Sequence, residues 1–330
     1  MAGSRAPPGS LARLVERLEP GGRLAGRRRL RGGVGARMDV LDIERADGAR
    51  RKVTLRRFPR DNRSSQPEQV THEYHVLQLV EKAGLSAPRP LLLDAEAELF
   101  GVPAIALTYL PGAPVYLPRD VGAWADQLAR ALLAIHAITS DRFDLSILNV
   151  QLPDGVRQEL ETRRPYAQRH GALARSVHAA LVEDIDYIGW QSATLVHDDF
   201  WPGNTVWHRG KLTGVVDWTH AEVGDPRTDV SQCRIDLAII LDLPAAETFR
   251  EAYQSNAAAP VSDIWYFDLL RGLRALLSYE FWLPGYHDAG LAHVTKRRAR
   301  TRIEAFLRAA LEERETARRA MPRRRVKRLQ

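Results

Sequence analysis

Cysteine is nearly absent from this chain of 330 residues, in which Cys233 is the only one. A single thiol cannot form a disulfide framework or build a metal site from several thiolates. The sequence therefore excludes the disulfide-rich secreted domains and the cysteine-rich zinc modules. Because chains without disulfides are typical of reducing compartments, we expect a cytoplasmic protein.

Long uncharged apolar runs are also scarce. Near the N-terminus, Arg13, Glu16 and Arg17 interrupt the apolar core that a signal peptide needs. The one uncharged stretch near membrane length, residues 99–118, contains four prolines, which remove backbone donors and break helices. We expect neither secretion nor a membrane span.

The formal net charge of +7 is distributed unevenly. Residues 296–330 hold 14 Lys and Arg against 4 Glu, and residues 1–31 hold 8 Arg against 2 Glu, which leaves the middle of the chain acidic. An acidic body with basic ends argues against nucleic acid as the main partner, although an anionic partner of the basic ends stays open.

The composition, with 45% hydrophobic and 27% charged residues, is that of an ordinary globular protein. Up to residue 112, short alternating segments surround one helical segment, and after residue 118 the apolar spacing is mostly helical. The expected elements are a helix at 10–19, strands at 37–44 and 51–57 joined by an Asp-Gly turn, a helix at 67–83, strands at 90–94 and 103–110, and short strands within 194–218.

This pattern predicts an α+β fold with a small β-rich N-terminal lobe and a larger helical C-terminal lobe, joined near residues 109–114. Ligands favour the space between such lobes. The expected division is an N-terminal helical appendage (1–27), an N-terminal nucleotide-binding lobe (28–112), a C-terminal catalytic and acceptor-binding lobe (113–295) and a basic helical C-terminal tail (296–330).

The chemistry concentrates in residues 195–204, LVHDDFWPGN, and 212–218, LTGVVDW. A Pro-Gly turn between apolar strands can aim Asp199, Asn204 and Asp217 at one point. Carboxylate and amide oxygens suit Mg²⁺, which takes its other ligands from water and substrate phosphates. A carboxylate beside such an ion can orient a hydroxyl group and accept its proton.

The pattern His-x-Asp-x-x-x-x-Asn followed by apolar-apolar-Asp-Trp resembles the aminoglycoside phosphotransferase family, small-molecule kinases of the protein-kinase-like fold. The interval from Asp199 to Asn204 is that of the kinase catalytic loop. The resemblance implies that Asp199 is the catalytic base, that Asn204 and Asp217 hold magnesium, and that His197 supports the site. Asp229, in the next landmark Gly-Asp-Pro-Arg-Thr-Asp, would brace the catalytic loop.

The resemblance extends to the nucleotide side of the site. Arg56 stands where kinases place a lysine for the phosphates, and Glu73 stands where its helix partner is expected. A guanidinium can hold phosphate with a fork of donors, in a geometry different from an ammonium's. The other implied nucleotide contacts lie in a glycine turn, which a simple tight turn explains equally well, and in the hinge: Gly32, Gly33, Gly35, Thr108, Tyr109 and Leu110.

Two residues depart from the family pattern and bear on the acceptor. Asp198 occupies a position where the family usually has Gly, and Trp201 stands where His is common. Asp198 either adds negative potential for a cationic acceptor or is a solvated loop carboxylate. By location, Asp198, Trp201 and Glu222 are candidate acceptor contacts.

Three other readings compete with this one. A protein kinase is disfavoured because the segment between Asp217 and Asp229 is too short to dock a peptide. A zinc or manganese hydrolase would use a His and Asp mixture, and a non-catalytic nucleotide binder would not need the three polar residues of the motif. The residues that the hydrolase reading would use are His197, Asp199, His208, Asp217 and His220.

We therefore expect a phosphotransferase that uses ATP, with GTP not excluded, together with Mg²⁺. Its acceptor would be a hydroxyl group of a small molecule, either an aminoglycoside or related antibiotic, or another metabolite such as an amino alcohol, a sugar or a macrolide. The acidic body suits a cationic acceptor. The sequence leaves the oligomeric state open.

Overall fold

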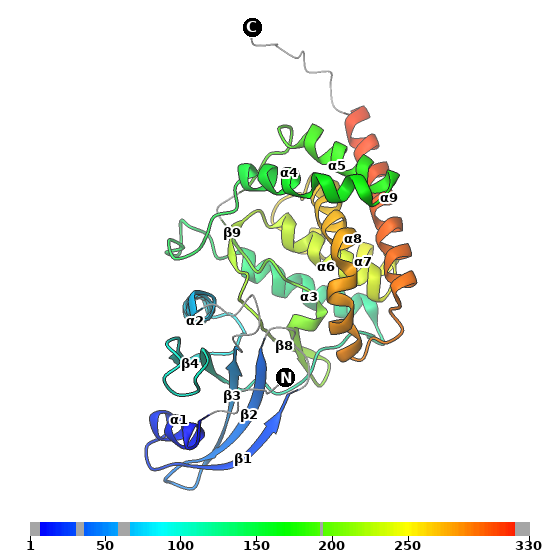
Figure 1. The fold of residues 1–330 in the computed structure, drawn as a ribbon. Helices are drawn as coiled ribbons and strands as arrows, with labels where there is room; N and C mark the ends of the chain where they lie inside the picture. The colour runs from blue at the N-terminus through cyan, green and yellow to red at the C-terminus, as the bar shows by residue number, and fades with distance from the viewer. Residues whose placement is uncertain (1–6, 31–35, 59–66, 192–193, 321–330) are drawn as a thin grey trace.

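A computed structural model describes residues 7–30, 36–58, 67–191 and 194–320 of the chain. Strands gather at one end of the molecule and helices at the other (Figure 1). The elements in chain order are α1 (Ser10–Leu18), β1 (Arg23–Arg29), β2 (Arg37–Glu44), β3 (Arg50–Arg57), α2 (Pro67–Lys82), β4 (Pro90–Asp94), β5 (Ala104–Thr108), α3 (Val121–His136), α4 (Pro153–Arg169), α5 (Ala172–Asp184), β6 (Thr194–Val196), η1 (Pro202–Asn204), β7 (Thr205–His208), β8 (Lys211–Val215), β9 (Glu222–Gly224), α6 (Arg227–Ile240), α7 (Leu243–Asn256), α8 (Ile264–Asp288) and α9 (Lys296–Ala320).

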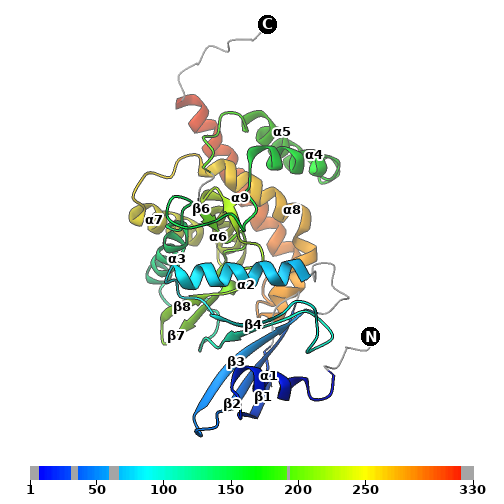
Figure 2. The same ribbon diagram turned by 90° about the vertical axis from the view of Figure 1, so that its left-hand side faces the viewer.

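The N-terminal lobe is built on an antiparallel five-stranded sheet with the order β1-β2-β3-β5-β4. The predicted Asp-Gly turn joins β2 to β3, and Gly48 takes the left-handed φ of 81° that a tight hairpin turn favours. Figure 2 shows α2 crossing between this sheet and the helices of the other lobe.

Strand alternation decides which side chains face the second lobe. Val53 and Leu55 of β3 belong to a core cluster on the α1 side of the sheet. Successive strand residues point to opposite faces, so Arg56 lies on the other face, where its guanidinium contacts Glu73 of α2. The same alternation places Ile105 of β5 in the large core cluster that continues into the C-terminal lobe.

The C-terminal lobe packs helices around α6, α7 and α8, and holds two short two-stranded sheets, β6 with β9 and β7 with β8. Helix α6 is buried along nearly its whole length. The predicted catalytic motif at 195–204 begins in β6, which pairs with β9, and continues through η1 to β7, which pairs with β8. The motif therefore lies between the two short sheets of this lobe. The α+β fold with a β-rich N-terminal lobe and a helical C-terminal lobe is confirmed.

Both ends of the described chain are more integrated than expected. Leu14 and Val15 of α1 are fully buried against the sheet, and β1 begins at Arg23, before the boundary expected at residue 28. At the other end, Ile303 and Phe306 of α9 are buried against the large core. Amphipathic spacing explains both differences, because an apolar helical stripe is stable only when another element covers it.

Among the described residues, no helix is both long enough and apolar enough to cross a membrane.

Candidate active site

Asp229 fixes the start of the loop that follows β6. Its carboxylate accepts hydrogen bonds from the backbone N–H groups of His197 at 2.7 Å and Asp198 at 2.8 Å. His136 lies 3.2 Å from the same carboxylate and 2.7 Å from the hydroxyl of Tyr253. Burial opposes the charge on Asp229, but its bonds from His136 and His197 outweigh that effect and lower its pKa. The predicted brace is therefore in contact with the loop.

His197 joins this loop to the strand end that carries Asp217. Its Nε2 lies 3.0 Å from the carbonyl oxygen of Val216, and since a carbonyl only accepts, Nε2 carries the proton. The ring is completely buried, and burial lowers the pKa of His197. A neutral, buried imidazole bonded to backbone fits a supporting role.

The structure brings Asp199, Asn204 and Asp217 together. Asn204 Nδ2 donates to the carboxylate of Asp199 and to its backbone carbonyl, both at 2.8 Å. The carbonyl of Asn204 accepts from the N–H of Val216 at 2.9 Å, which places Asp217 directly beside it. Asp217 takes a left-handed φ of 66° at this point.

The charges at this point fit a cation. Burial raises the pKa of Asp199 well above its usual range, and the nearby carboxylates of Asp217 and Asp236 add to the rise. Asn204 and Asp217 offer an amide oxygen and a carboxylate, the hard donors that Mg²⁺ prefers. A divalent ion would offset the mutual repulsion of the carboxylates, so the residues present fit the metal that the motif implies.

Arg56 reaches the same place from the N-terminal lobe. Its Nη1 forms an ion pair with Glu73, and its Nη2 donates to Asp217 Oδ1 at 2.9 Å. Burial disfavours the charged forms of Arg56, Glu73 and Asp217. Arg56 nevertheless lowers the pKa of Asp217 below its usual value, whereas burial raises the pKa of Glu73 to about 7. Arg56 therefore connects α2 with the acidic residues of the second lobe.

The predicted hinge follows β5 and crosses β7. Ala113 exchanges backbone hydrogen bonds with Trp207 at 3.1 and 2.9 Å. Tyr109 and Leu110 directly follow the last residue of β5, Thr108. Thr108 is bonded to Arg89: its N–H donates to the Arg89 carbonyl at 2.9 Å, and its hydroxyl accepts from the Arg89 N–H at 2.8 Å. The glycine turn proposed for the phosphates, with Gly32, Gly33 and Gly35, lies outside the described residues.

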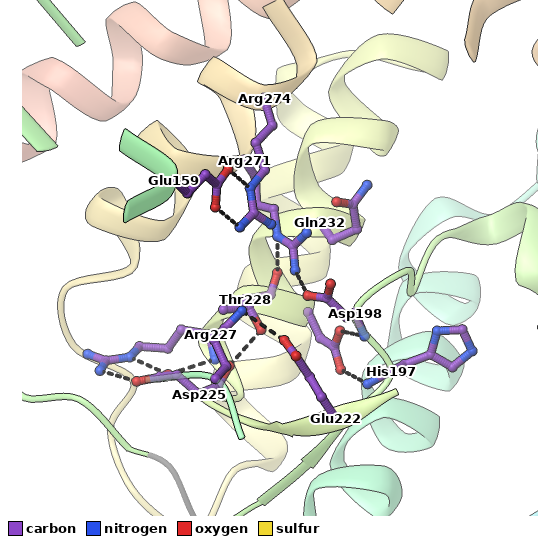
Figure 3. A network of polar contacts seen from close by, with 12 residues as sticks. Glu159, His197, Asp198, Glu222, Asp225, Arg227, Thr228, Gln232, Arg271 and Arg274 are labelled. Carbon is purple, nitrogen blue, oxygen red and sulfur yellow. Dashed lines mark hydrogen bonds and ion pairs between the residues drawn. The ribbon is translucent and has the colours of Figure 1, made fainter. Parts of the chain in front are cut away.

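Figure 3 shows that the Asp198 carboxylate does not lie free in the loop: it forms an ion pair with Arg271 of α8. Arg271 offsets the negative charge of Asp198, which was considered from the sequence as a source of negative potential for a cationic acceptor. Glu222 accepts from Gln151 Nε2 at 2.9 Å, and burial, with a contribution from Asp198, raises its pKa to about 7. Asp198 is therefore paired with a guanidinium, whereas Glu222 is bonded to a neutral amide.

The indole of Trp201 belongs to an aromatic wall beside the loop. It stacks on Tyr286 of α8 with a centroid distance of 5.2 Å and lies 5.9 Å from the ring of Tyr116. A Cβ at residue 203 would lie 2.1 Å from the Trp201 ring, which explains the glycine there. Arg271 and Tyr286 belong to no recognisable sequence motif, so the sequence did not identify either of them as a residue of the site.

A cavity of about 760 Å³ opens beside these carboxylates. Among the residues that the structure describes, its lining includes four acidic residues and three histidines and no Lys or Arg. The lining residues are Pro67, Glu68, Gln69, Thr71, His72, His75, Glu96, Ile147, Asn149, Asp198, Thr219, His220, Ala221 and Glu222.

The hydrolase reading finds no support in this geometry. No group of three or more His, Cys, Asp or Glu side chains in the described ranges is arranged to hold a metal ion. His197 uses its Nε2 on backbone, and His208 is exposed on its strand. A magnesium site that takes an amide and substrate phosphates as ligands needs no such cluster.

Residues 34–265, more than half of the chain, match the sequence profile of the phosphotransferase enzyme family. The chain belongs to this family of phosphotransferases, which confirms the family resemblance that the catalytic motif indicated.

Two curated proteins are related to parts of the chain. A homoserine kinase from Chelativorans sp. (strain BNC1) is 30% identical over 152 residues, which are 44% of this chain and 46% of that protein. Acyl-CoA dehydrogenase family member 10 from Mus musculus is 22% identical over 251 residues, or 71% of this chain and 23% of that protein. The chain thus spans less than half the length of either relative.

Solved structures share the fold along most of their length. A Ralstonia eutropha JMP134 protein, provisionally described as an aminoglycoside phosphotransferase, has a TM-score of 0.66 at 15% identity, covering 93% of this chain and 99% of that one. Macrolide 2'-phosphotransferase type I gives 0.60 at 18%, covering 94% and 98%. A thermostable mutant of aminoglycoside phosphotransferase APH(4)-Ia, in a ternary complex with ADP and hygromycin B, gives 0.62 at 18%, covering 90% and 97%.

Proposed function

We propose that this protein transfers the γ-phosphoryl group of ATP to a hydroxyl group of a small molecule, with Asp199 as the base. The observation that carries the proposal is the convergence of three side chains from the catalytic motif: the Asp199 carboxylate lies 2.8 Å from Asn204 Nδ2, and the Asn204 backbone is bonded to the residue before Asp217.

The acceptor hydroxyl would bind beside Asp199 and give its proton to that carboxylate. As its oxygen forms a bond to the γ-phosphorus, the bond from that phosphorus to the bridging oxygen breaks, and ADP leaves with the electron pair. The raised pKa of Asp199 suits this role, because a more basic carboxylate accepts a proton more readily.

Asn204 and Asp217 would hold Mg²⁺, which supplies charge stabilisation to the phosphates when it is bound. Arg56 would bind phosphate oxygens with its guanidinium, and Glu73 would keep that side chain in place. The hinge, with Thr108, Tyr109 and Leu110, would bind adenine through its backbone groups. The nucleotide requirement and the single, buried Cys233 are consistent with a cytoplasmic location, which we include in the proposal.

An aminoglycoside or related antibiotic is the acceptor that the acidic cavity supports first. The cavity of about 760 Å³ is within the range of small-molecule sites, and the carboxylates of Glu68 and Glu96 in its lining would complement amine groups. APH(4)-Ia, of similar fold, binds hygromycin B. An amino alcohol is the second candidate, favoured by the 30% identity to a homoserine kinase over 152 residues.

A screen of ADP release with Mg²⁺ tests the proposal, with ATP and GTP as donors and aminoglycosides, macrolides, homoserine and simple sugars as acceptors. We expect acceptor-dependent ADP release and a phosphorylated product whose mass is increased by one phosphate. Nucleotide binding without turnover on any acceptor would instead indicate the non-catalytic nucleotide binder.

A further inference from the structure

Asp198, the residue directly before the proposed base, holds a backbone conformation that suits glycine. Its φ is 59°, in the left-handed region, where most side chains are strained and where Asp is one of the better tolerated residues. Its N–H donates to Asp229 Oδ1 at 2.8 Å, so the backbone is fixed independently of the side chain. The turn therefore does not need the Asp198 carboxylate, and the surrounding structure has to balance its negative charge.

Arg271 provides that accommodation from a distant part of the chain. Its Nη2 forms the ion pair with Asp198, and its Nε donates to the carbonyl of Thr228 at 3.3 Å. Only 5% of the Arg271 side chain is exposed, against 21% for Asp198. Thr228 directly precedes Asp229, so Arg271 joins α8 to the start of α6 and to the catalytic loop (Figure 3).

The charges around this pair explain why a partner is required. The carboxylates of Asp199 and Glu222 both feel the negative charge of Asp198, which contributes to their raised pKa values after burial itself. Arg271 opposes the rise at Glu222 and at Asp236. Without its guanidinium, Asp198 would lose its hydrogen-bonded partner and keep only the longer-range attraction of Arg274, and repulsion from Asp198 would shift the neighbouring carboxylate of Asp199.

We propose that Arg271 is a positioning residue that neutralises Asp198 and ties it to α8, and that the protein needs Arg271 because its catalytic loop carries a carboxylate at residue 198. Through Asp198, Arg271 holds Asp199 at its working position. This inference rests on the proposed function, in which Asp199 is the base.

The experiment compares wild type, Arg271→Gln, Asp198→Gly and the double variant. Each is measured by ADP release with ATP, Mg²⁺ and the best acceptor of the screen, and by its thermal unfolding midpoint. Arg271→Gln should lose on the order of 10- to 100-fold in kcat with little change in KM for ATP, because a small misplacement of reacting groups costs that much. The double variant should regain about tenfold or more over Arg271→Gln, because Gly removes the unpaired charge and fits the backbone.

Arg234→Gln is the matched control. Arg234 is also a buried arginine between α6 and α8, paired with Asp268 at 3.0 Å and with Glu247 at 3.1 Å, but it does not bond to the catalytic loop. Its loss should lower the unfolding midpoint, and adding Asp198→Gly should recover no activity.

Additive effects of the two substitutions on kcat would overturn the proposal, as would equal recovery in the Arg234→Gln background. If Arg271→Gln does not fold, Arg271→Met, which is also uncharged, replaces it, and the same recovery or additivity decides. A wild type without any turnover would contradict the proposed function instead. The pair is then judged on the unfolding midpoints, where coupling of ~2 °C or more supports it and additivity overturns it.

Discussion

At the residue scale, the account depends on the environment of Asp199, which is partly buried, bonded to Asn204 and surrounded by other carboxylates. Replacing Asp199 with Asn keeps an oxygen that can accept from Asn204 but removes the proton acceptor. We expect kcat to fall by on the order of 10² to 10⁴, the range for a positioned base, while ATP binding stays within a few-fold of wild type.

Steady-state ADP release and calorimetric titration with a non-hydrolysable ATP analogue check this expectation. Asp154→Asn is the control, since that carboxylate is 95% exposed on α4 and should leave kcat unchanged. Unchanged turnover in Asp199→Asn would show that another group takes the proton.

The sequence was sufficient to predict contacts between site residues that lie close together along the chain. Asp199, Asn204 and Asp217 fall within one hairpin-like segment, so their spacing predicted a convergence that the structure shows. Arg56 and Glu73 come from a neighbouring strand and helix, and their contact was also predicted. Arg271 meets Asp198 across 73 positions, and helix spacing alone cannot say which turn of α8 faces the loop.

At the scale of elements, the C-terminal lobe depends on the close approach of α8 and α9. A Cβ built on Gly272 would lie 2.5 Å from Leu307 Cδ2 and 3.0 Å from its Cγ, so the helices touch where α8 has no side chain. Gly272→Ala should therefore lower the free energy of unfolding by ~1–3 kcal/mol through overpacking, which chemical denaturation measures.

Gly155→Ala in α4 is the matched control. Apart from neighbouring residues and the local helix backbone, no atom of the described residues lies within 4 Å of a Cβ built there, so the helix preference of Ala should leave stability equal or raise it by ~0.5–1 kcal/mol. A stable Gly272→Ala variant would mean that α9 does not pack against α8 as described.

Element types followed from periodicity, whereas the partners of the terminal elements did not. The alternating strands, the Asp-Gly turn and α2 formed close to the predicted residues. The amphipathic stripe of α9 predicts a helix with one apolar face, but nothing in the local pattern says that this face joins the main core. For the same reason, α1 was expected as an appendage and is in fact packed on the sheet.

At the scale of the whole molecule, the buried carboxylates make stability depend on pH. Burial raises the pKa of Glu222 from its usual 4.5 to about 7. Between these two values, the folded protein keeps a proton that the unfolded chain has lost, so this residue's contribution to stability falls as the pH rises from 4.5 to 7. Glu222→Gln carries no such proton and keeps an oxygen for Gln151.

Unfolding midpoints measured in steps from about pH 5 to about pH 8 check this prediction. The midpoint of the wild type should drop relative to that of Glu222→Gln as the pH rises through this window. The exposed carboxylate Glu251, replaced by Gln, should give a curve parallel to the wild type. A constant difference between wild type and Glu222→Gln would show that Glu222 ionises normally.

The most direct test of the central claim is a crystal structure of the protein with Mg²⁺ and a non-hydrolysable ATP analogue. We expect an ion with oxygen ligands from Asn204 and Asp217 at ~2.0–2.1 Å, the analogue's phosphates completing its shell, and the Asp199 carboxylate left open toward the γ-phosphate. An ion bound elsewhere, with phosphates remote from Asp199, would contradict the account.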